Sequence, residues 1–113
     1  DGSRVASAGA DNAIKIWNVE TGEQRRTISN YSKQVTAIHF VGVGDNIISA
    51  GGDASVKFHN SGNGGNYRTF GGAQDYVYGA LSTRDEGLVI AAGEDGVVRV
   101  WNGKNGQEVV KFE

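Results

Sequence analysis

The sequence predicts an all-β fold built from repeated antiparallel sheets. One stretch occurs three times at a spacing of 42 residues: SAGADNAIKIWN at 7–18, SAGGDASVKFHN at 49–60 and AAGEDGVVRVWN at 91–102. Short β-branched runs separated by glycine-containing turns surround each copy, and no segment carries a sustained helical stripe. A period of about 40 to 45 residues with a strand that ends in Trp is typical of one blade of a β-propeller.

The first strand of each repeat is expected at 4–8, 46–50 and 88–92. These runs are more uniformly apolar than alternating, which predicts strands that are covered on both faces. A tight turn follows each run, and its central residues are Asp11, Asp53 and Asp95. An Asp carboxylate can accept backbone N–H groups two residues further on, so these three residues are predicted to be structural turn residues.

The next strand alternates with a period of two. Its apolar pairs are Ile14 with Ile16, Val56 with Phe58, and Val98 with Val100. The opposite face carries a Lys or Arg and then Trp17, His59 or Trp101, so we expect a half-buried strand whose cationic side chain covers apolar surface.

A hairpin leads to the third strand type, at 24–28, 67–70 and 108–112. The hairpins contain Thr21–Gly22, Asn63–Gly64 and Asn105–Gly106, and Asn-Gly favours tight turns because both residues tolerate positive φ. The strands beyond are polar and read as edge strands protected by charge. A fourth type occurs only at 34–40 and 76–82, which gives eleven strands and no helix.

These features resemble the WD40 repeat family over essentially the whole chain. The matching residues are the Gly-x-Asp turn, the apolar strand and the Trp that ends it, with Trp17-Asn18 and Trp101-Asn102 as the repeat Trp positions. The resemblance implies WD40-type β-propeller blades, which are four-stranded antiparallel sheets, in a partial propeller of about 2.7 repeats of 42 residues. The blades would be 1–28, lacking its innermost strand, 34–70 and 76–113, all within one repeat region, 1–113.

The family's pattern is incomplete in this chain. Its usual Gly-His pair is absent, since the corresponding positions hold Asn30-Tyr31 and Gly72-Ala73. His59 replaces the repeat Trp, and Ala91 stands where Ser7 and Ser49 occur. The hydrogen-bond chain that joins His, Asp, Ser and Trp in typical members is therefore broken, and we expect the blades to depend more on apolar packing.

Composition excludes several classes of partner. The 113 residues include 18 Gly and no Pro, Cys or Met, and the formal net charge of −2 favours neither nucleic acid nor an anionic membrane. No apolar run approaches the roughly 20 residues of a membrane span. The chain begins at Asp1 inside a repeat, so we expect a piece of a longer protein, or a chain that self-associates to complete a propeller.

The resemblance implies a scaffold that binds other proteins or peptides. The favoured places are the loops 29–33 and 71–75 with the turns 10–12, 52–54 and 94–96, because rigid strands hold loops in register. Tyr31, Lys33 and Tyr76 are the candidate partner-binding side chains, since exposed aromatic residues often anchor interfaces. The alternative for Tyr31 is that it packs where the family's His would lie.

No motif indicates an enzyme, and we expect no catalytic residue, cofactor or metal ion. The Gly51-Gly52-Asp53 run lacks the nine-residue rhythm of calcium-binding repeats, and His39 and His59 have no carboxylate at a matching spacing. One enzymatic alternative is a quinoprotein-like propeller, because Thr21-Gly22 is similar to a turn of those blades, although their downstream Trp is absent. A purely architectural segment of a multidomain protein is the other alternative.

Overall fold

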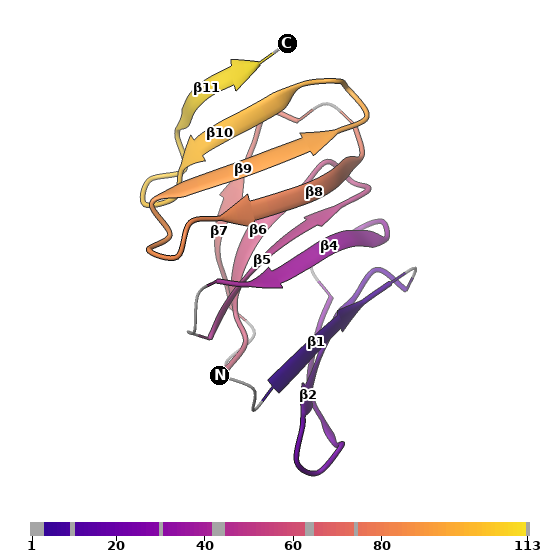
Figure 1. Ribbon diagram of the computed structural model, residues 1–113. Helices are drawn as coiled ribbons and strands as arrows, with labels where there is room; N and C mark the ends of the chain where they lie inside the picture. Colours follow the sequence, from indigo (N-terminus) through magenta and orange to yellow (C-terminus); the bar gives the residue numbers. More distant parts are fainter. Residues whose placement is uncertain are drawn as a thin grey trace.

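A computed structural model describes residues 4–9, 11–29, 31–41, 45–62, 65–73 and 75–112 (Figure 1). Within these residues the chain forms eleven strands and no helix, as predicted. The strands are β1 (Arg4–Ala8), β2 (Ile14–Asn18), β3 (Gln24–Ile28), β4 (Val35–Phe40), β5 (Asn46–Gly51), β6 (Val56–Asn60), β7 (Asn66–Phe70), β8 (Val77–Ser82), β9 (Leu88–Gly93), β10 (Val98–Asn102) and β11 (Glu108–Phe112).

The strands pair into three antiparallel sheets that repeat one design. The sheets have the orders β1-β2-β3, β4-β5-β6-β7 and β8-β9-β10-β11. The register recurs after 42 residues, with Ala8 opposite Ile14, Ala50 opposite Val56 and Ala92 opposite Val98. The pairing with β3, β7 and β11 also shifts at the same repeat position each time. The three sheets are therefore blades of one type.

The sheets stack beside one another along the chain. Strand β4 contacts β1 on one side and β8 on the other, and in Figure 1 these strands follow one another down the same side of the molecule. The polar strands β3, β7 and β11 form the opposite edge of each sheet. This places the loops between blades, and the β1–β2, β5–β6 and β9–β10 turns, at one common end of the strands.

Two apolar clusters hold the three sheets together. One lies between the first and second sheets and consists of Ile14, Ile16, Ile28, Tyr31, Val35 and Ile47. The other lies between the second and third sheets and consists of Val41, Ile48, Ala50, Val56, Phe58, Phe70, Val77, Ala80, Val89, Ala91 and Trp101. In the larger cluster the Phe70 ring contacts both Phe58, edge-on at 5.2 Å, and Trp101 at 5.6 Å. Burial between sheets is the main stabilising force here.

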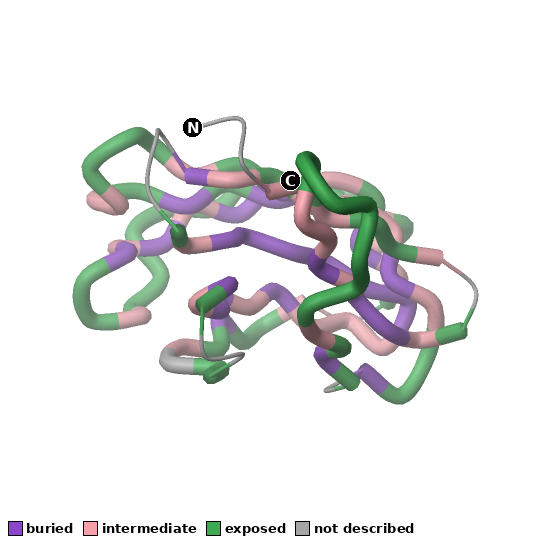
Figure 2. The backbone as a smooth tube through the Cα atoms, turned by 90° about the horizontal axis from the view of Figure 1, so that it is seen from below, coloured by how far each residue is buried: buried purple, intermediate pink, exposed green. Residues whose placement is uncertain are grey.

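The prediction that the first strand of each repeat is covered on both faces is correct only for β5. That strand is buried from Ile47 to Gly51, because its sheet has a neighbour on each side. In β1 and β9 alternate residues are exposed, since each of these sheets packs against one neighbour only. Figure 2 shows the buried residues running through the middle of the molecule and the exposed ones at the turns and along the C-terminal strand β11.

The hairpins use glycine differently from the prediction. Gly22 and Gly106 have φ of 73° and 80°, whereas Thr21 and Asn105 before them are not in the left-handed region. Each glycine N–H donates to the carbonyl of the Asn four residues earlier, at 2.9 Å and 2.8 Å. The turn therefore needs positive φ at one residue only. The third predicted pair, Asn63–Gly64, lies outside the described residues.

Candidate partner-binding surface

The loops predicted to contact a partner lie together at one end of the strands. Residues 31–33 precede β4, and residues 71–73 and 75 precede β8. The turns 11–12, 52–54 and 94–96 join β1 to β2, β5 to β6 and β9 to β10. Ala10, Asn30 and Gln74 of these loops lie outside the described residues. The end is held in place by the strands beneath it, so its side chains have fixed relative positions.

The three turn aspartates make the same local hydrogen bond. One carboxylate oxygen accepts the backbone N–H two residues on, at 3.3 Å for Asp11, 3.0 Å for Asp53 and 3.1 Å for Asp95. The residue after each Asp takes positive φ, at 67° in Asn12 and 69° in Ala54. The third copy has Gly96 there, with φ of 75°. The carboxylates therefore cap turns in this structure.

The second carboxylate oxygen has a different partner in each blade. In Asp11 it lies 3.4 Å from the Lys15 ammonium, in an exposed pair. In Asp53 it accepts the Ser32 N–H at 2.9 Å and the Ser32 hydroxyl at 3.2 Å. Partial burial raises the pKa of Asp53, but the hydrogen bonds from Ser32 and Ser55 outweigh burial and hold this pKa below its usual value.

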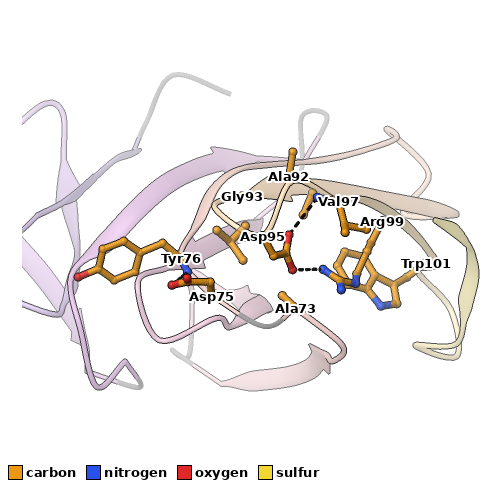
Figure 3. A pocket seen from close by; sticks show the side chains of 11 residues that line it. Ala73, Asp75, Tyr76, Ala92, Gly93, Asp95, Val97, Arg99 and Trp101 are labelled. Carbon is orange, nitrogen blue, oxygen red and sulfur yellow. Dashed lines mark hydrogen bonds and ion pairs between the residues drawn. The ribbon is translucent and has the colours of Figure 1, made fainter. Parts of the chain in front are cut away.

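The third blade has a buried ion pair at this position. The Arg99 guanidinium donates to Asp95 at 2.7 Å, and the two side chains are only 7% and 14% exposed. The Nε atom of Arg99 lies 3.6 Å from the Oε1 atom of Glu108. Figure 3 shows Asp95 and Arg99 in the centre of a recess with Trp101 beside them, while the Tyr76 ring points away from it. The recess is therefore filled by a structural ion pair.

The side chain at the repeat Trp position also has different hydrogen-bond partners in each blade. The Trp17 indole N–H donates to the Ser7 hydroxyl at 2.9 Å, and the Trp101 indole N–H donates to the Gly71 carbonyl at 2.9 Å. His59 is fully buried, and among the described residues neither of its ring nitrogens has a hydrogen-bond partner. Burial, together with a smaller contribution from the nearby Lys57 charge, lowers the pKa of His59 to about 4.

Of the two alternatives for Tyr31, the structure has the packed one. Its ring is 5% exposed, and its hydroxyl lies 2.6 Å from the Ser49 hydroxyl. The Lys57 ammonium lies 4.6 Å from the ring centroid. Burial raises the pKa of Tyr31 far above its usual value, with the Asp53 charge acting in the same direction. The expectation of an exposed Tyr31 is wrong, because this ring fills space between the first two sheets.

Lys33 and Tyr76 lie together on the accessible end of the blades. The exposed Lys33 ammonium is 5.5 Å from the centroid of the Tyr76 ring. One edge of the ring lies close to the chain at Gly52, where an added Cβ would be 2.5 Å from it. Tyr76 is therefore fixed between the second and third blades, with Lys33 over it.

Sequence reasoning included Glu94 in a predicted binding turn but missed Tyr78 as a member of this surface. The Tyr78 side chain is 55% exposed and its hydroxyl donates to Glu94 at 2.6 Å. Its ring centroid lies 6.2 Å from that of Tyr76. The hydrogen bond to Glu94 raises the pKa of Tyr78, and the Glu94 and Asp75 charges add to this effect. Alternation along β8 was a usable signal, because Tyr78 faces away from the buried Val77.

The described part of the chain offers neither a metal-binding cluster nor a membrane-spanning helix. It contains no cluster of three or more His, Cys, Asp or Glu side chains that could hold a metal ion. His39 is exposed on β4, whereas His59 is buried. The same residues include no helix that could span a membrane.

The repeated four-stranded blades define a protein of the β-propeller type. The family model described as "WD domain, G-beta repeat" matches residues 1–18, 22–60 and 64–102, which is most of the chain. The chain therefore belongs to the WD40 repeat family. WD40 repeats indicate a propeller-type scaffold for protein interaction, and proteins built from them are generally not enzymes.

Proposed function

We propose that this chain binds a partner protein or peptide through the loop end of its second and third blades. The observation that carries the proposal is the group formed by Lys33, Tyr76, Tyr78 and Glu94. It combines exposed aromatic area with fixed polar groups, and aromatic residues are enriched where interfaces gain most of their binding energy. The stacked sheets beneath it hold these groups in place before a partner arrives, which lowers the entropy cost of binding.

The same residues support binding rather than catalysis. The hydroxyls of Ser7 and Ser49 are engaged by Trp17 and Tyr31, so neither is paired with a base that could activate it. In the third blade the largely buried side chains of Asp95 and Arg99 neutralise each other. We therefore propose a scaffold that performs no reaction of its own.

A capture experiment tests this function. The immobilised chain would be incubated with a lysate of its source organism, and retained proteins would be identified by mass spectrometry. The double variant Tyr76→Ala/Tyr78→Ala should lose the retained partner, whereas Arg84→Ala should keep it. Arg84 is an exposed residue in the β8–β9 turn at the opposite end of the strands. Equal capture by both variants would rule out the loop end as the binding surface.

A second candidate role is self-association through the flat faces of the outer blades. Phe112 on β11 is 59% exposed, whereas its counterparts Ile28 and Phe70 are 2% and 0% exposed in the two packed interfaces. At the other end of the stack Val5 is 50% exposed, whereas its counterpart Ile47 is fully buried. The two faces correspond to the two sides of an existing blade interface, so a second copy could add head to tail.

Light scattering after size exclusion tests this second role. The chain should elute as a dimer or larger, and Phe112→Glu should shift it to a monomer. Val109→Glu should leave the assembly intact, because Val109 is equally exposed but alternates with Phe112 along β11 and faces the other way. A folded wild-type monomer at high micromolar concentration would exclude self-association.

A further inference from the structure

The Tyr76 and Tyr78 rings form an aromatic pair at the start of β8. Their centroids are 6.2 Å apart and their planes are inclined at 70°. The first ring is braced against Gly52, and the second is tied by its hydroxyl to Glu94. Both rings thus have a fixed contact, although Tyr78 is more than half exposed.

Negative charge surrounds this pair. Glu94 is exposed beside Tyr78, with its carboxylate 2.6 Å from the phenol oxygen. Asp75 is exposed directly before Tyr76 and accepts that residue's N–H at 2.8 Å. The faces of aromatic rings are themselves electron-rich. The two carboxylates and the two ring faces therefore all attract an approaching cation and repel an approaching anion.

The chain already places one cation on this surface. The Lys33 ammonium lies 5.5 Å from the Tyr76 centroid, within the range of a cation–π contact. Lys33 is exposed and belongs to the loop before β4, in the neighbouring blade. Its flexible stem can move aside at small cost, whereas the Tyr76 ring is packed against the chain at Gly52. Lys33 therefore shows what chemistry the surface accepts and leaves the Tyr78 ring uncovered.

We propose that this surface binds a lysine or arginine side chain of a partner peptide, and that Lys33 occupies part of the site until the partner displaces it. The inference rests on the proposed binding function and names the chemistry of the partner. Tyr78 provides an aromatic face, Glu94 and Asp75 provide opposite charge, and Tyr76 provides the second ring. An acidic partner would meet two carboxylates and is disfavoured.

Four peptides of twelve residues test the proposal. They share one glycine- and serine-based sequence and differ only in a central Lys, Arg, norleucine or Glu. Each is titrated into the ¹⁵N-labelled chain, and amide shifts of Tyr76, Tyr78 and Glu94 are followed. The Lys and Arg peptides should shift these signals in a saturable way that weakens with added salt. The norleucine and Glu peptides should leave them unchanged up to about 10 mM, a concentration that detects the weak affinity of single exposed cation–π contacts.

The variants make the test specific to the residues. Tyr78→Ala should weaken the Lys peptide about two- to five-fold, whereas Tyr78→Phe, which keeps the ring, should stay near wild type. Lys33→Gln should strengthen binding about two- to three-fold, because the competing cation is gone. Arg84→Gln removes the same charge at the opposite end and should have little effect.

Each contrary outcome has one meaning. The proposal of a cationic partner would be overturned if Lys33→Gln bound the Lys peptide more weakly, or if the norleucine or Glu peptide bound as well as the Lys peptide. Absence of any shift with the Lys and Arg peptides would overturn it as well. If the lysate partner is lost with Tyr76→Ala/Tyr78→Ala while the peptides show no charge preference, the inference fails and the binding function stands. If the lysate partner survives that variant, the binding function fails.

Discussion

The Tyr31 hydroxyl lies 2.6 Å from the Ser49 hydroxyl, and this contact replaces one made by Trp in the first blade. There the Trp17 indole N–H reaches Ser7, the counterpart of Ser49. In the second blade His59 occupies the repeat Trp position, and its ring nitrogens have no hydrogen-bond partner among the described residues. A tyrosine from the preceding loop thus satisfies the same serine. Gly51 makes room for it, because an added Cβ would lie 2.5 Å from the ring.

Removing the Tyr31 hydroxyl should destabilise the fold. Tyr31→Phe leaves the buried Ser49 hydroxyl with only a long 3.5 Å contact to the Lys57 carbonyl, so we expect a loss of about 1–2 kcal/mol in the free energy of unfolding. Urea denaturation followed by Trp fluorescence measures it. Tyr78→Phe, at an exposed position, is the matched control and should change little. Adding Ser49→Ala to Tyr31→Phe should cost less than the sum of the two, and strict additivity would show that the contact is not coupled.

The turn at Ala54 should be improved by glycine. Ala54 has φ of 69°, which is unfavourable for a residue with a Cβ, and the third repeat has Gly96 at this position. Ala54→Gly should therefore raise the unfolding free energy by roughly 1 kcal/mol. Gly96→Ala is the reciprocal control and should lower it by a similar amount, since its added Cβ meets no atom within 4 Å and only backbone strain acts. Two changes of the same sign would refute this reading of the turn.

Asp95 should contribute more to the free energy of unfolding than Asp11, because its partner Arg99 is buried whereas Lys15 is far more exposed. Asp95→Asn leaves the buried Arg99 charge without its closest partner, so a loss of about 3 kcal/mol is expected. Asp11→Asn weakens only an exposed pair with Lys15 and should cost less than about 1 kcal/mol. Both substitutions keep an oxygen for the turn hydrogen bond. Chemical denaturation of the two variants side by side gives the comparison, and equal losses would contradict it.

Acid should loosen the contact between the first two sheets through His59. Its pKa is about 4 in the folded chain against 6.5 as the ordinary value, so the unfolded chain takes up the proton first. The associated stability is complete above pH 6.5 and is lost progressively as the pH falls from 6.5 to 4, by up to about 3 kcal/mol.

Unfolding free energies measured at several pH values between 4 and 7.5 check this effect. His59→Leu should remove the part of the acid dependence that belongs to this ring. It should also be neutral or stabilising near pH 7.5, because two unpaired buried nitrogens disappear. His39→Leu, at an exposed position on β4, should retain the acid dependence. An unchanged pH profile in His59→Leu would show that His59 is not its source.

The backbone of the blades was predictable because its signals are local. The alternation of Ile14 with Ile16 and of Val56 with Phe58 and the Gly-x-Asp turns are each visible within a dozen residues, and the 42-residue period repeats these local signals along the chain. Strand pairing between neighbours follows from short hairpins, so the order of strands in each sheet needed no long-range information.

The chain's sequence alone determined the eleven strands, their grouping into repeated sheets and the turn positions of Asp11, Asp53 and Asp95. Only the tertiary structure decided which residues at corresponding repeat positions are buried and which are exposed. Phe70 is buried and its counterpart Phe112 is exposed because the stacking of one sheet on the next sets which faces lose water. The pairing of Tyr78 with Glu94 and of Asp95 with Arg99 likewise depends on side-chain directions that a repeated pattern does not encode.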